Sequence, residues 1–398
     1  MTIFDVIVVG AGLMGSAAAR HLAKDGATVA LIGPVEPEQK HDHSGVFASH
    51  YDAARITRKL DSRPNWARFS QAAIGRYAEV AQQGEQSFFA PVGAIIAGPE
   101  NGAGSDFIQS AQRNARQDRI THTALRGAAL RDRFPYFEFP DGILALHEAD
   151  DAGWIDPRAH VRAEIAAAEK LGVTIYQTEV AQLIEVTDGV QAVCIDGQVI
   201  MGAKAMVACG AFSKAEGLLP DPLPLTAYAR TIAFFELDDA EAARLRDMPS
   251  VVYLPPDLVT DPYILPPVRY PDGKTYIKIG GDPVDRELHD VAEMKDWFRT
   301  DGDPDVGRFL ETLLTGLMPD LAYRAVTTGS CSTCFTPHGN PLIYHQTDRL
   351  MVLTAGNGAG AKCADELGRL GALVASGGAI PSEIYEGVFH AQALGFIS

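Results

Sequence analysis

The feature that most constrains the fold is a strand–turn–helix–strand unit at the start of the chain. The apolar, β-branched run Phe4–Val9 predicts a buried parallel strand. The Ala-rich segment Ser16–Lys24 has no proline and predicts a helix that Gly26 ends. Thr28–Ile32 predicts a second strand. Together these segments form a βαβ unit, which is typical of a parallel α/β sheet.

The turn inside this unit has the spacing G-x-G-x-x-G. Gly10 permits a tight turn, Gly12 lets a pyrophosphate approach the backbone, and Gly15 lets helix and strand pack closely. The N–H groups at the helix N-terminus and the positive end of its dipole then face the phosphates. The unit therefore predicts dinucleotide binding, with Met14 in the same loop.

One expected feature of such a site is missing. An acidic residue about 20 residues further on usually hydrogen-bonds the ribose. The second strand ends instead at Ile32-Gly33-Pro34, and the nearest acid is Glu36. Either Glu36 reaches back to the ribose, or backbone and water hold it. The identity of the dinucleotide must therefore come from elsewhere in the chain.

Composition narrows the class of protein. A chain of 398 residues exceeds what one hydrophobic core usually serves, so two domains are expected. The net charge of −17 argues against a nucleic-acid or anionic-membrane partner, since both need a basic face. Five sparse cysteines favour a reducing compartment, and no apolar stretch is long enough for a bilayer. We expect a cytoplasmic monomer with no signal peptide and no metal.

Strand, glycine turn and helix recur in the middle and at the end of the chain. Asp156 and Pro157 begin a middle helix, which the strand Val173–Tyr176 follows. Ala205–Phe212 is a strand that runs into a turn at Gly210. Near the end, the strand 350–354 precedes another glycine turn and a helix. These segments can all join the parallel sheet that begins at Phe4.

Segments of a different character separate these pieces. A helix is predicted at Trp66–Gln82 and a strand at Phe89–Ala97, and probable antiparallel strands follow at Thr231–Glu236 and Thr275–Gly280. Helices are predicted within 291–318. The inserted segments therefore favour a second, β-rich domain.

We predict an α/β fold with two discontinuous domains. The dinucleotide-binding domain comprises residues 1–78, 147–216 and 326–398, and the substrate domain comprises residues 79–146 and 217–325. The second domain is expected to be a β-sheet with flanking helices. A ligand site should lie between the domains, at the carboxyl edge of the parallel strands.

Two arginines follow the first unit, in the stretch Ser49-His50-Tyr51 to Arg58. Arg55 and Arg58 are three residues apart, so on a helical turn they would share a face. Arg58 can donate two parallel hydrogen bonds to a carboxylate, and Arg55 adds a second charge. On spacing alone, two solvated surface arginines remain the simpler reading.

Two later motifs, taken alone, do not indicate a functional site. Lys278 alternates with Ile277 and Ile279 in a predicted strand, so its side chain points to the opposite side. Alone, it would be a solvent-facing lysine. Cys331 and Cys334 form a C-x-x-C pair, which without a second pair is a weak zinc signal. Alone, they would be buried, inert cysteines.

The last glycine turn is followed by a lysine. Gly356, Gly358 and Gly360 would let a planar ring approach the backbone closely, and the helix after them directs N–H groups toward it. Lys362 opens that helix, although it could also be merely solvated.

Taken together, these motifs resemble the D-amino acid oxidase-like superfamily of FAD-dependent oxidoreductases. Within it, the chain is similar over its whole length to the monomeric sarcosine oxidase and N-methyltryptophan oxidase branch. The resemblance implies a Rossmann-like FAD-binding domain of the glutathione reductase type and a β-sheet substrate (catalytic) domain. The resemblance also implies that the predicted dinucleotide is FAD.

The resemblance implies roles for individual residues. Arg58 and Lys362 match the pair that binds the substrate carboxylate, and Arg55 matches the arginine beside the flavin ring. Lys278 matches the lysine near flavin N5 where oxygen is activated, and Tyr263 resembles the active-site tyrosine. The catalytic residues implied are Lys278, Arg58, Lys362, Arg55, Tyr51 and Tyr263.

Cys331 matches the cysteine that carries the flavin through a thioether, since it stands five residues before Thr336. The resemblance therefore implies FAD held covalently through Cys331, with noncovalent FAD as the open alternative. The implied cofactor-binding residues are Gly10, Gly12, Met14, Gly15, Gly33, Ser49, His50, Arg55, Val180, Gly210, Cys331, Gly356, Gly358, Gly360 and Lys362.

The sequence departs from the family pattern at four positions. Tyr51 and Asp282 stand where the family has histidine, Thr333 where it has an aromatic residue, and His338 where it has aspartate. These departures put the identity of the substrate in doubt, because several of them would face the flavin or the substrate.

The implied activity is FAD-dependent oxidation of an amino acid or N-alkyl amino acid to an imine, with oxygen reoxidising the flavin and giving hydrogen peroxide. One alternative is a dehydrogenase of the same superfamily that passes electrons to another acceptor. Another is a noncatalytic flavin-binding protein. A nicotinamide-dependent dehydrogenase would leave the second glycine loop and its lysine without a role.

Overall fold

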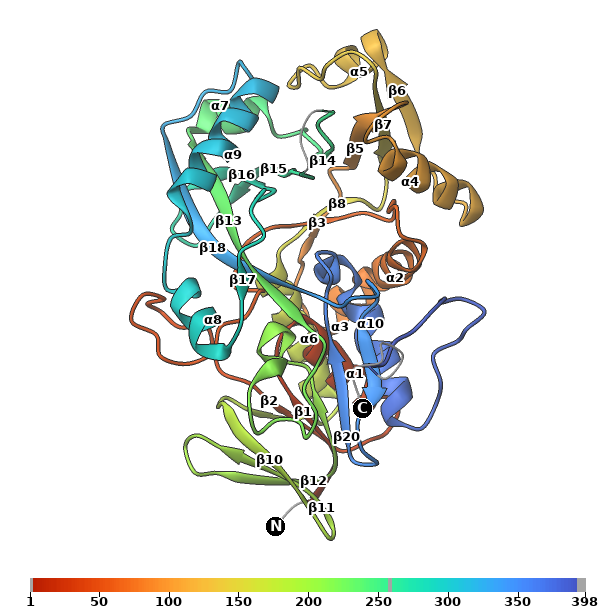
Figure 1. Cartoon of the computed structure of the whole chain (residues 1–398), viewed down its shortest axis with the longest axis vertical. Coiled ribbons are helices and arrows are strands. Elements are labelled where there is room, and N and C mark those ends of the chain that lie inside the picture. The colour runs from red at the N-terminus through yellow and green to blue at the C-terminus, as the bar shows by residue number, and fades with distance from the viewer. Residues whose placement is uncertain (1–2, 257–259, 392–398) are drawn as a thin grey trace.

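The computed structural model describes residues 3–256 and 260–391. Its lower part, as drawn in Figure 1, is built on an eight-stranded sheet. Five neighbouring strands of this sheet are parallel, in the order β9-β2-β1-β12-β20. Their bounds are Thr174–Tyr176, Val29–Ile32, Ile3–Val9, Val199–Val207 and Leu350–Thr354. The antiparallel strands β10 (Val180–Val186), β11 (Gly189–Cys194) and β19 (Leu342–His345) complete it.

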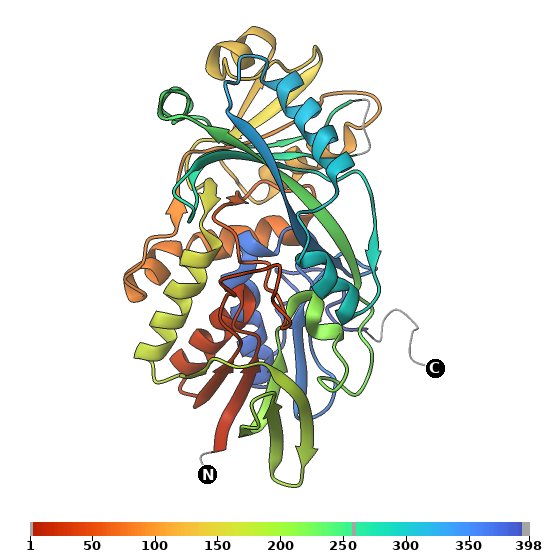
Figure 2. The same cartoon turned by 90° about the vertical axis from the view of Figure 1, so that its left-hand side faces the viewer.

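Three helices cover one face of this sheet. α1 (Leu13–Lys24) packs between α6 (Pro157–Lys170) and α10 (Gly360–Ala375), and Figure 2 shows the three side by side. The approach of α1 and α10 depends on small residues, because a Cβ on Gly368 would lie 2.6 Å from the Cβ of Ala17. The predicted α/β fold and its N-terminal βαβ unit are therefore confirmed.

The upper part is built on a nine-stranded, mostly antiparallel sheet, with a separate three-stranded sheet beside it. Both predicted insertions contribute to the larger sheet, while the exact domain boundaries stay a prediction. Its strands are β5 (Ala94–Pro99), β6 (Thr123–Arg126), β7 (Ile143–Glu148), β13 (Thr226–Leu237), β14 (Ser250–Tyr253), β15 (Tyr263–Arg269), β16 (Thr275–Gly280), β17 (Glu287–Leu288) and β18 (Ala325–Phe335).

Short helices flank this sheet, and a long two-stranded ribbon leaves it. β13 and β18 pair antiparallel from Thr226 opposite Phe335 to Glu236 opposite Ala325, and the ribbon descends toward the parallel sheet in both views (Figures 1 and 2). The helices are α4 (Asp106–Gln117), α5 (Gly127–Arg133), α7 (Asp239–Arg244), α8 (Val291–Phe298) and α9 (Pro304–Leu317).

Two predicted elements are wrong in extent. The predicted helix at Trp66–Gln82 is two helices, α2 (Pro64–Ile74) and α3 (Tyr77–Gln83), because the chain turns at Gly75, a poor helix former. The predicted strand at Phe89–Ala97 is split into β4 (Phe89–Ala90) and β5, because Gly93 has a φ of +82°. Within residues 3–256 and 260–391, no helix is long and apolar enough to cross a membrane.

Candidate active site

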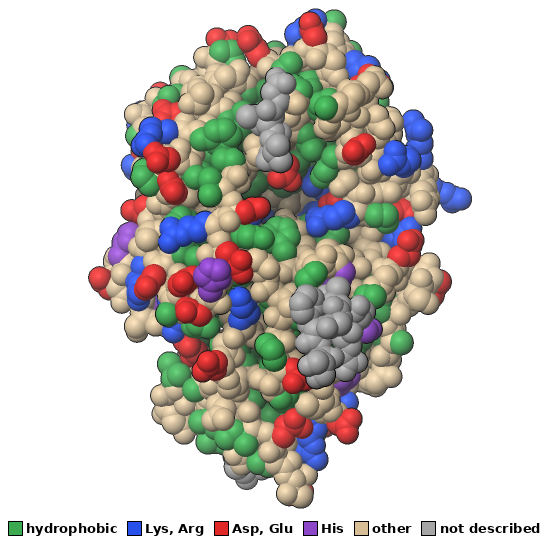
Figure 3. Space-filling view, in the orientation of Figure 1, with side chains coloured by type: hydrophobic (Ala, Val, Ile, Leu, Met, Phe, Trp, Pro, Cys, Tyr) green, Lys and Arg blue, Asp and Glu red, His purple; other side chains and the backbone are tan. Residues whose placement is uncertain are grey.

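A cavity of about 840 Å³ lies where the parallel strands end and the β13–β18 ribbon arrives. Residues following β1, β2 and β12 line one side of it, and residues of β13, β15 and β18 line the other. In Figure 3 the surface is hollowed at mid-height, with Lys or Arg side chains on both sides of the hollow. Every predicted site residue lines the cavity except Gly15 and Lys278.

The first glycine turn fits the pyrophosphate of FAD. A Cβ on Gly15 would lie 1.8 Å from the carbonyl oxygen of Gly10, so this position must be glycine for α1 to pack on β1. A Cβ on Gly12 would face the cavity, with only His50 Nδ1 within 4 Å among the described atoms. No side chain caps the N-terminus of α1, so its first N–H groups remain available to phosphate oxygens.

The last glycine loop is held in an unusual backbone conformation. Ala355 and Asn357 have φ values of +71° and +44°, in the left-handed region that non-glycine residues rarely adopt. Asn357 fixes the loop, since its Oδ1 accepts from the backbone N–H of Thr336 at 2.9 Å and its Nδ2 donates to the carbonyl of Ala355 at 3.0 Å. A Cβ on Gly360 would lie 3.0 Å from Met14 Cε. The two glycine loops therefore meet at one end of the cavity.

Arg58 and Lys362 meet at one buried carboxylate that the sequence did not single out. Asp61 Oδ2 lies 3.2 Å from Arg58 Nη1 and 3.1 Å from Lys362 Nζ. Burial disfavours the ionised acid, but the charges of Lys362, Arg58 and Arg63 together hold the pKa of Asp61 well below its usual range. Burial lowers the pKa of Lys362, and Asp61 opposes that shift. The predicted pair is thus brought together, with a third partner.

A second carboxylate, Asp52, joins Arg55 to Lys278. Its Oδ2 accepts from Lys278 Nζ at 2.6 Å and from Arg55, and its Oδ1 accepts from the hydroxyl of Tyr270 at 3.1 Å. Lys278 also donates to the carbonyl of Ala54 and is only 1% exposed. It therefore lies one layer behind the cavity wall. Burial, followed by the charge of Arg55, lowers the pKa of Lys278 well below its usual range, and Cys331 opposes that shift.

The two arginines do not lie on a helical turn. Arg55 begins a strand, β3 (Arg55–Thr57), which pairs with β8 (Gly153–Ile155). Arg58 follows the last residue of this strand, and the two arginines reach two different carboxylates, Asp52 and Asp61, instead of sharing a face. The interpretation of Lys278 as pointing away from Ile277 holds, but both sides of β16 are buried.

Cys331 lies on β18 and lines the cavity as a free thiol. Its Sγ is 3.6 Å from Arg55 Nη2, and its carbonyl accepts from Trp297 Nε1 at 2.7 Å. Cys334 is buried, and burial raises the pKa of its thiol. Tyr51 also lines the cavity, where burial raises its pKa to about 12.

Glu36 does not line the cavity, so the first reading for the ribose acid is wrong. Its two oxygens accept from Arg158 Nε at 2.7 Å and Nη2 at 2.6 Å on the surface. Asp52, Asp61 and Glu179, which the sequence analysis missed, lie at or beside the cavity. Asp61 stands three residues after Arg58, a spacing that could have suggested an ion pair.

Comparison with known proteins places the chain among flavoenzymes. Residues 5–372 match the model of the FAD dependent oxidoreductase family. The N-methyl-L-tryptophan oxidase of Yersinia pestis (strain Pestoides F) is 26% identical over 386 residues, covering 96% of this chain and 97% of that protein.

Solved structures share the fold. The structure of NikD, an unusual amino acid oxidase essential for nikkomycin biosynthesis, has a TM-score of 0.74 at 18% identity, covering 98% of this chain and 100% of that one. The fructosyl amine: oxygen oxidoreductase (Amadoriase I) of Aspergillus fumigatus has a TM-score of 0.71 at 21% identity, covering 97% and 89%. The similar proteins named here are oxidases of amines or amino acids. The chain belongs to the FAD dependent oxidoreductase family.

Proposed function

We propose that the protein oxidises the C–H bond beside the nitrogen of an amino acid or N-alkyl amino acid, giving an imine, and passes the electrons to dioxygen, giving hydrogen peroxide. The observation that carries this proposal is the arginine–lysine pair at the cavity. Arg58 and Lys362 share the single carboxylate of Asp61, and Arg58 Nε is buried with no hydrogen-bond partner among the described residues. N–H groups that lack a partner of their own can donate hydrogen bonds to an anionic group of the substrate.

In this proposal, Arg58 and Lys362 bind the substrate carboxylate and so fix the adjacent C–H bond in the cavity. Their positive charge also disfavours the ammonium form of the substrate, and only the neutral amine can give up electrons. FAD, when bound, supplies the two-electron redox chemistry. The names of two similar proteins support the proposal, since one is an oxidase of an N-methyl amino acid and the other an amine: oxygen oxidoreductase.

An anaerobic screen of N-methyl and free amino acids tests the substrate class. A substrate should bleach the flavin absorbance, and the matched amine that lacks the carboxylate should bleach it far more slowly. Admitting air should then restore the colour and release hydrogen peroxide. Recovery only with an artificial acceptor would favour a dehydrogenase, and no bleaching by any amine would favour a noncatalytic flavin-binding protein.

Lys278 is proposed to assist the reaction with oxygen, because its buried Nζ, which donates to Asp52, lies 5.9 Å from the ring centroid of Tyr263 at the cavity wall. In Lys278→Met, anaerobic bleaching should survive while recovery in air slows sharply. Equal loss of both steps would contradict this role.

Covalent attachment through Cys331 is also proposed. The exposure of its thiol to the cavity and the 3.6 Å contact with Arg55 support it. Acid precipitation should leave yellow flavin on the polypeptide of the native protein and of Cys334→Ser, but not of Cys331→Ser. If the colour of the native protein moves wholly to the supernatant, the flavin is not covalent.

A further inference from the structure

The position where a ribose-binding acid is expected cannot hold one in this chain. A Cβ on Gly33 would lie 2.6 Å from both the Cβ and the backbone nitrogen of Ala11, so a side chain there would collide with the first glycine turn. Glu36 has both oxygens engaged by Arg158 outside the cavity. The hydroxyl groups of the adenosine ribose therefore need a different acceptor.

The neighbouring strand brings an acid to the same edge of the sheet. β2 and β9 are parallel, with Ile32 opposite Tyr176, and the N–H of Gly33 donates to the carbonyl of Tyr176 at 3.0 Å. The segment after β9 thus leaves the carboxyl edge beside Gly33. Glu179 is the third residue of that segment and lines the cavity together with Val180.

The other carboxylates of the cavity are engaged or lie elsewhere. Among the described residues, the acids that line it besides Glu179 are Asp61, Asp261, Asp282 and Asp285. Asp61 is bound to Arg58 and Lys362. The remaining three lie beside β15 and β16 of the second sheet. Glu179 is therefore the one lining acid, within the part of the chain that the structure describes, that belongs to the dinucleotide-binding sheet.

The carboxylate of Glu179 is held in place yet keeps one free oxygen. Its Oε2 accepts from the backbone N–H of Val46 at 3.2 Å. Its Oε1 lies 3.9 Å from Lys295 Nζ and accepts no hydrogen bond from any described residue. We infer that Glu179 accepts the hydroxyl groups of the adenosine ribose of FAD, so that the ribose acid has moved from the end of β2 to the segment after β9.

The inference is tested on the full-length apoprotein, produced in riboflavin-starved cells so that no flavin is attached. Calorimetry would measure the binding of ADP and of 2′,3′-dideoxy-ADP, which lacks both ribose hydroxyls. Native protein should prefer ADP by about ten- to hundredfold, the value of hydrogen bonds to a charged group. In Glu179→Gln, which keeps the shape and an acceptor for Val46, the preference should fall to about fivefold or less.

Glu36→Gln is the matched control and should keep the full native preference. The inference is overturned if native protein binds both nucleotides equally, a result that needs no variant to fold. It is also overturned if Glu179→Gln weakens both nucleotides by the same factor, because Glu179 would then only hold the loop at Val46. Thermal unfolding of each variant shows that the comparison is made on folded protein.

Discussion

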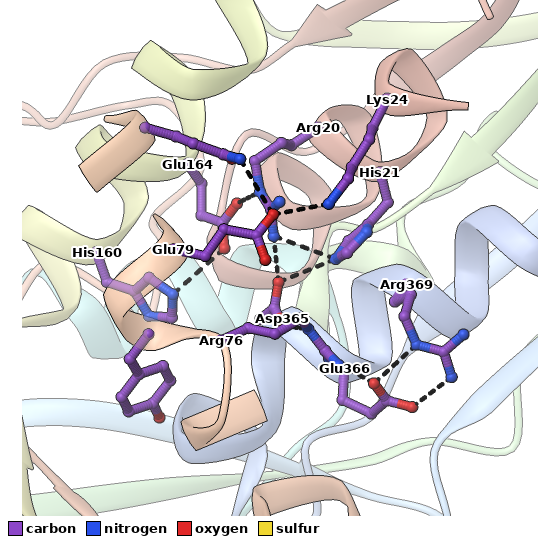
Figure 4. A network of polar contacts seen from close by, with 12 residues as sticks. Arg20, His21, Lys24, Arg76, Glu79, His160, Glu164, Asp365, Glu366 and Arg369 are labelled. Carbon is purple, nitrogen blue, oxygen red and sulfur yellow. Dashed lines mark hydrogen bonds and ion pairs between the residues drawn. The ribbon is translucent and has the colours of Figure 1, made fainter. Parts of the chain in front are cut away.

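Two buried clusters of charge are anchored on α10, and they differ in balance. The first lies among α1, α3, α6 and α10 and does not line the cavity (Figure 4). Arg20 bridges Glu164 and Asp365, and Arg76 bridges Asp365 and Glu366. Within the described chain its ion pairs join four Arg or Lys side chains to four carboxylates: Arg20, Lys24, Arg76 and Arg369 with Glu79, Glu164, Asp365 and Glu366. His21 also contacts Asp365, and His160 contacts Glu164.

The second cluster, at the cavity, has more cations than carboxylates. Among the described residues, its ion pairs join Arg55 and Lys278 to Asp52, and Arg58, Arg63 and Lys362 to Asp61. A buried charge is costly unless it is paired, so a balanced cluster needs no ligand. The excess of positive charge at the cavity is a reason to expect an anionic ligand there, whereas the first cluster gives no such reason.

The largest effect should come from unbalancing the first cluster. Arg20→Met would remove the cation that Glu164 and Asp365 share at a fully buried position. Because two buried carboxylates would then lose this partner, the free energy of unfolding should fall by about 3–5 kcal/mol. Urea unfolding measures this. Lys24→Met, at a pair that is half exposed, should cost less than about 1 kcal/mol. If Arg20→Met is as stable as native protein, the cluster is not structural.

Removing a cation from the cavity cluster should instead reduce activity. Arg58→Met would delete charge-assisted hydrogen bonds to the substrate carboxylate, so kcat/KM should fall about 100-fold. Steady-state kinetics on an amino acid that bleaches the flavin measures this. The matched amine without a carboxylate should lose little, and an equal loss on both would show that Arg58 does not bind the carboxylate.

Increasing the excess of positive charge at the cavity should strengthen the binding of anions there. Asp61→Asn removes the acid that competes for Arg58 and Lys362, so acetate should bind at least about fivefold more tightly, because charges interact more strongly at a buried site than in water. Titration of the flavin spectrum with acetate measures the change. Weaker binding in this variant would show that Asp61 orients the two cations more than it neutralises them.

His50, which lines the cavity, should make the stability of the protein depend on pH. Burial, followed by the charges of Arg158, Arg162 and Arg55, lowers its pKa to about 3. The unfolded chain binds a proton near pH 6.5 that the native state does not, so stability is full above that pH and falls below it. From pH 7 to 5, native protein should lose about 1–2 kcal/mol more unfolding free energy than His50→Gln. If the unfolding free energies of native protein and His50→Gln change equally with pH, the lowered pKa of His50 is contradicted.

Local motifs explain which parts of the site could be predicted from sequence. The glycine turns, Arg58 and Lys362 belong to short patterns with fixed spacing, and each of them lines the cavity. Asp52 and Glu179 could not be predicted, because their partners are remote: Lys278 is 226 residues from Asp52. The pairing of β13 with β18 and the bridge from Arg20 to Asp365 likewise depend on tertiary packing.

The β13–β18 ribbon makes Cys331 part of the substrate sheet. In the register of the ribbon Cys331 stands opposite Arg230, and unbroken pairing extends to both sides of it. Both strands of the ribbon belong to the nine-stranded sheet, so this pairing fixes the position of Cys331 relative to that sheet. A shift of this sheet relative to the parallel sheet would therefore carry the proposed flavin anchor with it.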